Sequence, residues 1–260
     1  MANVLVITDL EGVSGVLDME SVKNESSVGY QNAVKSLMED TNTAVSALFD
    51  AGAKTVYVVD GHGSGKNFVK GALDKRAKQV YTWELGEIIA SIDCFIMVGT
   101  HAMAKTPNAF FDHTQLWEEI TGYYYNGERI GEIAQMGAFA GEYGIPCVFA
   151  SGDEAACSEA LRFYEGISLA PVKKALSRSE AIPYDNALSL IYEKAKEGFL
   201  NRKNVKPYKV EVPLTIKVEY ASEDACDNDA KCVKEFKRLS PTAIEVYKDK
   251  IVDYFDVLIY

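Results

Sequence analysis

Histidine is scarce in this sequence of 260 residues, which contains only three: His62, His101 and His113. All three lie in the first half of the chain beside glycines or acidic residues, and two follow apolar runs typical of β-strands. A residue type that only filled the core would not be confined to such positions. The distribution therefore favours a chemical role for these imidazoles.

Long hydrophobic runs are also missing. The longest lies around residues 95–98, whereas a membrane-spanning helix needs about 20 consecutive apolar residues. The first twelve residues carry no basic segment and only a four-residue apolar stretch, unlike a secretory signal. We therefore expect a soluble, cytoplasmic protein with no membrane partner.

The pattern of the cysteines and the shortage of basic residues argue against a disulfide-rich protein and against a nucleic-acid-binding protein. The five cysteines are odd in number and form no CxxC pair, which argues against a disulfide framework. We expect Cys94 and Cys147 to be reduced and packed inside strands. Lysine and arginine number 27 against 38 acidic residues, and the net charge of −11 opposes the basic surface that nucleic acid requires. Nucleic acid is therefore not an expected partner.

Strand-like and helix-like segments alternate over the first 150 residues. Apolar runs at residues 3–7, 54–59, 93–98 and 146–150 predict strands. Helical signals occupy residues 30–50, 131–143, 153–161 and 179–199. This order predicts an α/β protein with a mainly parallel, twisted sheet flanked by helices. An alternating strand at residues 209–218 predicts a smaller C-terminal α+β portion, and Tyr-Asn-Gly at residues 125–127 predicts a hairpin turn.

Polar side chains follow three of the predicted strands. Asp9 and Glu11 come after the first strand, His62 after the second and His101 after the third. Glu132 stands at the start of a predicted helix. The carboxyl ends of parallel strands open into one crevice, so residues distant in sequence converge there. We therefore expect three carboxylates and two imidazoles at this edge of the sheet.

This mixed set of oxygen and nitrogen donors suits Zn²⁺ better than Ca²⁺ or Mg²⁺, which prefer oxygen alone. Five ligands exceed what one tetrahedral ion needs, so we predict two Zn²⁺ per subunit, with Asp9 bridging them and Mn²⁺ or Co²⁺ as alternatives. Such a pair can activate water for attack on a carbonyl. Taken singly, each residue also has a structural explanation as a helix cap, a turn former or a partner of a helix dipole.

The glycine-rich segment at residues 61–67 invites a nucleotide-binding interpretation, which fails in detail. A phosphate-binding Walker loop needs a glycine where this chain has Asp60 and a serine or threonine where it has Asn67. The glycines instead allow a tight turn that points His62 back into the site.

The domain prediction follows from these assignments. We assign residues 1–206 to an α/β metal-binding catalytic domain and residues 207–260 to a C-terminal α+β extension, which is either separate or part of the same domain. No repeat, low-complexity segment or clear linker divides them. The acidic stretch between Cys226 and Cys232 matches no familiar ligand spacing, so we interpret it as a solvated turn.

Six motifs in one order make the chain similar to the zinc-dependent D-aminopeptidase family, over most of its length. They are Asp-x-Glu-Gly-x-Ser-Gly at residues 9–15, Asp-x-His at 60–62, Gly-x-His-Ala at 99–102, Thr-Pro and then a histidine at 106–113, Gly-Glu at 131–132, and Ser-Gly-Asp at 151–153. Each string is weak alone, but the shared order makes the resemblance specific.

The resemblance implies which residues bind a pair of zinc ions: Asp9, Glu11, His62, His101 and Glu132. It also implies that His113 is the catalytic residue. That position has been assigned as a nucleophile in the family, and a proton carrier or an oxyanion stabiliser is physically as reasonable. Asp112 is a candidate to orient the imidazole of His113 or to raise its pKa.

The resemblance further implies a binuclear aminopeptidase that removes the N-terminal residue of short peptides, including peptides of D-amino acids, and a ring-shaped homo-oligomer. Two alternatives stay open. A binuclear metallohydrolase of a non-peptide amide or a phosphoester would use the same ligands. A non-catalytic metal- or peptide-binding protein would keep the scaffold without turnover.

Overall fold

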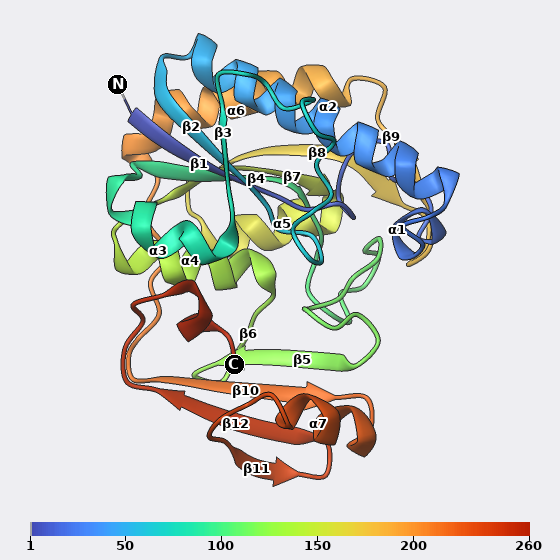
Figure 1. Ribbon diagram of the computed structural model, residues 1–260, viewed down its shortest axis with the longest axis vertical. Helices are drawn as coiled ribbons and strands as arrows, with labels where there is room; N and C mark the ends of the chain where they lie inside the picture. Colours follow the sequence, from blue (N-terminus) through green and yellow to red (C-terminus); the bar gives the residue numbers. More distant parts are fainter. Residues whose placement is uncertain (1) are drawn as a thin grey trace.

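The apolar runs of the sequence form the central strands of a parallel sheet. The computed structural model describes residues 2–260 and contains two sheets (Figure 1). Neighbouring strands of the larger sheet are parallel except β8 and β9. In sheet order its strands are β3 (Lys78–Val80), β2 (Ala53–Asp60), β1 (Ala2–Thr8), β4 (Cys94–Thr100), β7 (Cys147–Asp153), β8 (Ser168–Ala175) and β9 (Ala181–Pro183).

Helices cover both faces of this sheet. The α-helices are α1 (Glu20–Lys23), α2 (Val28–Asp50), α3 (Leu85–Ile88), α4 (Glu132–Glu142), α5 (Glu154–Phe163), α6 (Ala187–Asn201) and α7 (Glu223–Ala230). Four short 3₁₀ segments complete them: η1 (Thr82–Glu84), η2 (Ile89–Ser91), η3 (Arg202–Asn204) and η4 (Tyr254–Val257). Figure 1 shows α2 and α6 on one face and α3, α4 and α5 on the other.

The alternation of side chains along each strand builds a core on each face. Val4 and Val6 of β1 belong to the core beneath α2 and α6, whereas Leu5 belongs to the core on the side of α4 and α5. Both cores contain fully buried residues of β4 as well. The mainly parallel α/β fold predicted from the sequence is confirmed.

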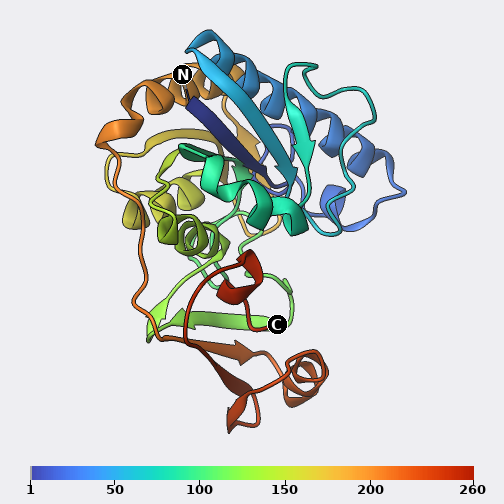
Figure 2. The ribbon, with the colours of Figure 1, turned by 60° about the vertical axis from the view of Figure 1, so that its left-hand side comes forward.

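The second sheet is antiparallel and lies beyond α4, as two views agree (Figures 1 and 2). Its strands, in sheet order, are β11 (Lys237–Ser240), β12 (Ala243–Lys248), β10 (Leu214–Tyr220), β5 (Ile120–Tyr125) and β6 (Glu128–Arg129). Ile216 of β10 pairs with Tyr125 of β5, so the sheet joins the middle of the chain to its last part. Asn126 and Gly127 have φ values of 49° and 86°, which makes the predicted hairpin turn.

Three local predictions were wrong. The helix predicted at residues 179–199 begins only at Ala187, because β9 occupies residues 181–183. The strand predicted at residues 209–218 begins at Leu214, directly after Pro213, which has no N–H to give to a sheet. The turn predicted between Cys226 and Cys232 is largely the helix α7, which Ser222 caps by accepting a hydrogen bond from Ala225 N.

Among residues 2–260, no helix combines the length and the apolar character that a bilayer crossing requires.

Candidate metal centre

The loop after β1 lies tightly against the end of β4. Asp9 N donates to Val98 O at 2.9 Å and Gly12 N donates to Gly99 O at 2.7 Å. A Cβ atom on Gly12 would lie 2.0 Å from Thr100 O, so only glycine fits there. This close approach fixes the backbone between the carboxylates of Asp9 and Glu11 and the strand that leads to His101.

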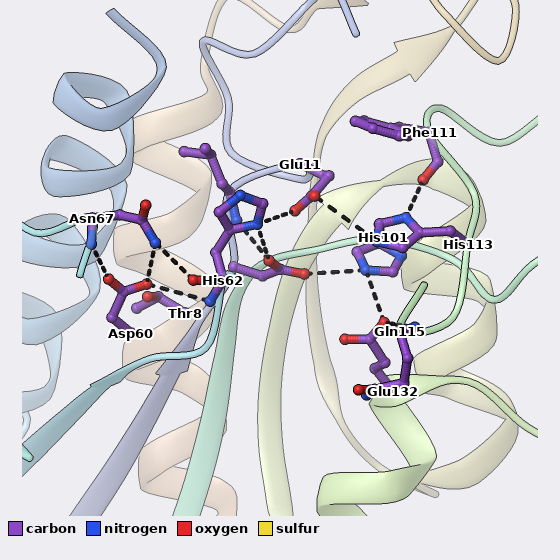
Figure 3. Close-up of polar contacts among 12 residues, drawn as sticks. Thr8, Glu11, Asp60, His62, Asn67, His101, Phe111, His113, Gln115 and Glu132 are labelled. Atoms are coloured by element: carbon purple, nitrogen blue, oxygen red, sulfur yellow. Dashed lines mark hydrogen bonds and ion pairs between the residues drawn. The ribbon is translucent and has the colours of Figure 1, made fainter. Parts of the chain in front are cut away.

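The loop after β2 turns back toward the same edge. Gly63 and Gly65 have φ values of 55° and 70°, in the left-handed region that glycine adopts without strain. Asp60 holds this turn, since its carboxylate accepts from Asn67 N at 2.5 Å and from Asn67 Nδ2 at 3.1 Å. His62 is thereby directed inward, and its Nδ1 lies 3.0 Å from Glu11 Oε2 (Figure 3).

Asp9 lies between two imidazoles. Its Oδ1 is 3.2 Å from His62 Nδ1 and its Oδ2 is 3.2 Å from His101 Nε2. His101 Nε2 is also 3.5 Å from Glu132 Oε1, at the first residue of α4. The five predicted ligands therefore converge, and the two oxygens of Asp9 face the two halves of the cluster.

His113 completes the cluster. Its ring stacks on that of His101, with centroids 3.8 Å apart and an interplanar angle of 10°. Its Nδ1 lies 2.8 Å from Phe111 O and its Nε2 lies 3.9 Å from Glu11 Oε1. Because a carbonyl can only accept, Nδ1 carries a proton and Nε2 is left to face the site.

The charges of the cluster are strongly coupled. Burial would lower the pKa of His62, but the charge of Glu11 and the hydrogen bonds of Asp9 and Glu11 raise it to about 11. Burial would raise the pKa of Asp9, yet hydrogen bonds with His101 and His62 hold it well below its usual range. For His113, burial and the charge of His101 lower the pKa, so its ring is neutral near pH 7.

The donor set fits a pair of divalent cations. Three carboxylates in a largely buried cluster require compensating positive charge, which in the protein alone comes from protons on imidazoles. The closely spaced donor atoms divide into His62 with Asp9 and Glu11, and His101 with His113 and Glu132. Mixed imidazole and carboxylate donors are typical zinc ligands, and binding would release the protons that the imidazoles hold.

A cavity of about 460 Å³ opens onto the cluster. Besides the six predicted residues it is lined by Met136 of α4, by Gln115 and Trp117 of the loop after His113, and by Tyr254 of η4. Tyr254 belongs to the last segment of the chain, which returns from the second sheet. No sequence pattern predicts this tyrosine near the site, because the contact arises only from the return of that segment.

Asp112 has a different role from the predicted one. Its carboxylate accepts from Lys105 N at 2.6 Å and from Arg178 Nε at 2.9 Å, while the ring of His113 pairs with Phe111 O. Asp112 therefore fixes the backbone of the loop rather than the imidazole itself. This loop needs such anchoring because Phe111 and Gln115 have positive φ values of 48° and 60°.

Gln115 is a residue of the site that sequence reasoning missed. Its backbone N donates to Glu132 Oε1 at 2.7 Å, and its Nε2 donates to Gln135 Oε1 at 2.9 Å. The loop that carries His113 therefore also orients the carboxylate of Glu132. No motif marks such a backbone contact in the sequence.

Comparisons with known proteins identify the family of the chain. A family model, Peptidase_M55, described as D-aminopeptidase, matches residues 2–259. A D-aminopeptidase of Bacillus subtilis (strain 168) is 25% identical over 221 residues, which are 82% of this chain and 80% of that protein. The solved structure of the Zn-dependent D-aminopeptidase DppA from Bacillus subtilis, a self-compartmentalizing protease, has the same fold. Its TM-score is 0.91 at 21% identity, over 98% of this chain and 95% of that one. Since the family model covers nearly the whole sequence, the chain belongs to the Peptidase_M55 family of D-aminopeptidases and is a peptidase.

Proposed function

We propose that this protein is a binuclear metal-dependent aminopeptidase that removes the N-terminal residue of short peptides, including peptides that begin with a D-residue. One observation carries the proposal: the carboxylate of Asp9 lies 3.2 Å from an imidazole nitrogen on each side. Such an arrangement is suited to a carboxylate shared by two cations. The family of the chain supplies the reaction class.

The proposed cofactor is a pair of zinc ions in each subunit. Asp9, Glu11 and His62 would hold one ion, and Asp9, His101 and Glu132 the other. When bound, the pair supplies Lewis-acid polarisation of a carbonyl and makes water a stronger nucleophile. Support comes from the donor set and from the zinc dependence stated for DppA.

His113 would transfer a proton from the attacking water to the leaving amine. Its ring is neutral near pH 7, its Nδ1 is held by Phe111 O, and its Nε2 faces the cavity beside Glu11. This nitrogen can take a proton from the attacking water and return it to the leaving amine, a role typically worth about 10²–10⁴-fold in rate. The stack on His101 limits rotation of the ring and keeps Nε2 in place.

We also propose a ring-shaped homo-oligomer. DppA is described as self-compartmentalizing, a property that requires several subunits around an enclosed space. Sedimentation of the purified protein tests this part of the proposal separately from its activity.

The decisive experiment combines metal analysis with a substrate panel. Protein purified without chelator should contain about two zinc ions per subunit. It should cleave pairs of dipeptides that differ only in an L- or a D-residue at the N-terminus, and it should not cleave a phosphoester. His113→Ala should keep the metal and lose turnover by about 10²–10⁴-fold. Absence of bound metal, or phosphoester hydrolysis without peptide hydrolysis, would overturn the proposed function.

A further inference from the structure

Within residues 2–260 one lysine is fully buried, and no sequence motif singled it out. Lys173, on β8, is 0% exposed. Its Nζ donates to the backbone carbonyls of Glu11 at 2.5 Å, Val13 at 3.0 Å and Val16 at 2.6 Å. All three N–H protons of the ammonium are therefore directed at one loop, the loop that carries Asp9 and Glu11.

The same ammonium contacts the loop of His113. Lys173 Nζ lies 4.4 Å from the centroid of the Phe110 ring, a distance typical of a cation–π contact. Phe110 N in turn donates to Asp153 Oδ2 at 2.8 Å. One side chain of β8 thus touches both the loop of the carboxylates and the loop of the neighbouring imidazole.

Burial lowers the pKa of Lys173, and the charges of two buried acids, Asp153 and Asp40, oppose this shift. Asp40 of α2 accepts from Ser14 N at 2.7 Å and from Ser14 Oγ at 2.6 Å, so it holds the same loop from its other side. Asp153 caps α5 through Ala156 N. Buried charged groups need hydrogen-bond partners, and both carboxylates find theirs in backbone N–H groups of the loops that lead to the site, Ser14 N for Asp40 and Phe110 N for Asp153.

We propose that Lys173 is a positioning residue of the metal centre, which fixes Glu11 by holding the backbone carbonyls of residues 11, 13 and 16. Resting on the proposed function, this inference names a determinant of metal affinity outside the set of ligands. A lysine can reach three carbonyls at once because its ammonium has three donors at the tip of one chain. Methionine has a similar length and no donor, so it would leave those carbonyls without a partner.

Loss of the contacts of Lys173 should affect the affinities of the two ions unequally. Glu11 belongs with His62, whereas His101 and Glu132 are held by β4, α4 and Gln115. Release of the loop should therefore weaken the ion beside His62 more than the ion beside Glu132. Loss of an outer contact of a metal ligand typically weakens affinity by about 10–100-fold.

The test is a zinc titration of Lys173→Met against a competing chromophoric chelator. We expect one ion to bind about 10–100-fold more weakly than in the unaltered protein, and the other to change by less than about 3-fold. Lys174→Met, an exposed neighbour on the same strand, should match the unaltered protein. Val172→Ala, in the core on the other side of β8, controls for a general loss of stability and should keep both affinities.

Hydrogen exchange of the Gly12 and Ser14 amides gives a second readout that needs no turnover. Exchange should quicken in Lys173→Met and stay slow in Val172→Ala. Lys173→Gln keeps an amide donor and replaces the methionine variant if that variant does not fold. Its exchange rates should lie between those expected for Lys173→Met and for Val172→Ala. Equal zinc affinities and exchange rates in folded Lys173 variants would overturn the inference.

Failure of both Lys173 variants to fold would also overturn the inference, because the lysine would then be a requirement of the fold and not of the site. If the unaltered protein itself binds no zinc, the proposed function fails instead. The titration therefore distinguishes the two failures.

Discussion

Asp9 and His101 directly follow two neighbouring strands of the sheet, β1 and β4, and Asp9 Oδ2 is 3.2 Å from His101 Nε2. The opposite oxygen of the same carboxylate faces His62 at the same distance. Backbone contacts enforce this relationship, since Asp9 N donates to Val98 O at the end of β4. The two halves of the cluster are therefore linked through one side chain.

Asp9→Asn should remove the link. An amide is a poor ligand for two cations, so we expect both zinc ions to be lost and kcat/KM to fall by more than about 100-fold, several kcal/mol of transition-state stabilisation. Metal content after dialysis measures the first effect and peptide hydrolysis the second. Asp18→Asn, at an exposed residue outside the cluster, is the control, and retention of both ions by Asp9→Asn would contradict a shared ligand.

Gly12→Ala should destabilise the fold. The added Cβ would lie 2.0 Å from Thr100 O and 2.4 Å from Gly99 C, so the loop must move away from β4. Overpacking of this kind typically costs about 1–3 kcal/mol, to be read from urea unfolding. Gly29→Ala, in α2 with its nearest contact at 3.3 Å, should change stability by less than about 1 kcal/mol. A similar effect of both substitutions would show that the close approach is unimportant.

Glu159 should make stability depend on pH. Burial raises its pKa to about 7, and its Oε1 has no hydrogen-bond partner within residues 2–260. The folded state therefore favours the protonated acid, while the unfolded chain ionises near pH 4.3. The resulting stabilisation is fully present below about pH 4 and is lost as pH rises toward 7, by about 3 kcal/mol.

Glu159→Gln should remove this slope, because the amide stays neutral at every pH. Urea unfolding between pH 4 and pH 8 measures the pH dependence of the free energy of unfolding. The variant should be more stable than the unaltered protein above pH 7. Glu142→Gln, on the exposed face of α4, should leave the slope intact. Parallel pH profiles for Glu159→Gln and the unaltered protein would refute the argument.

Arg178→Met should loosen the loop of His113 without removing metal. Arg178 Nε donates to Asp112 Oδ1 and its Nη2 to Asp112 O, both at 2.9 Å. A small displacement of a catalytic group can slow a reaction by up to about 100-fold, so we expect kcat to fall while zinc content stays constant. Arg162→Met, which breaks an exposed pair with Glu128, should not alter kcat. An unchanged kcat in Arg178→Met would show that this anchor does not position the imidazole.

The strands and most helices could be predicted because their apolar spacing reflects burial directly. Runs such as Val4 to Val6 are buried on both faces of the sheet, so they form continuous apolar segments in the sequence. Predictions failed where tertiary structure overrides local pattern. The short strand β9 forms only because it pairs with β8, and a three-residue segment has no periodicity to reveal it.

The sequence by itself determined which candidate residues reach one edge of the sheet. His62, His101 and the acidic residues follow strands whose carboxyl ends must meet in a parallel sheet, and their spacing resembles that of one family. Only the tertiary structure decided that Asp9 stands between two imidazoles, that Tyr254 lines the cavity beside them and that Lys173 holds the backbone of the loop after β1. The physical reason is that strand position fixes which edge a residue reaches, whereas distances between side chains depend on how loops from different elements pack.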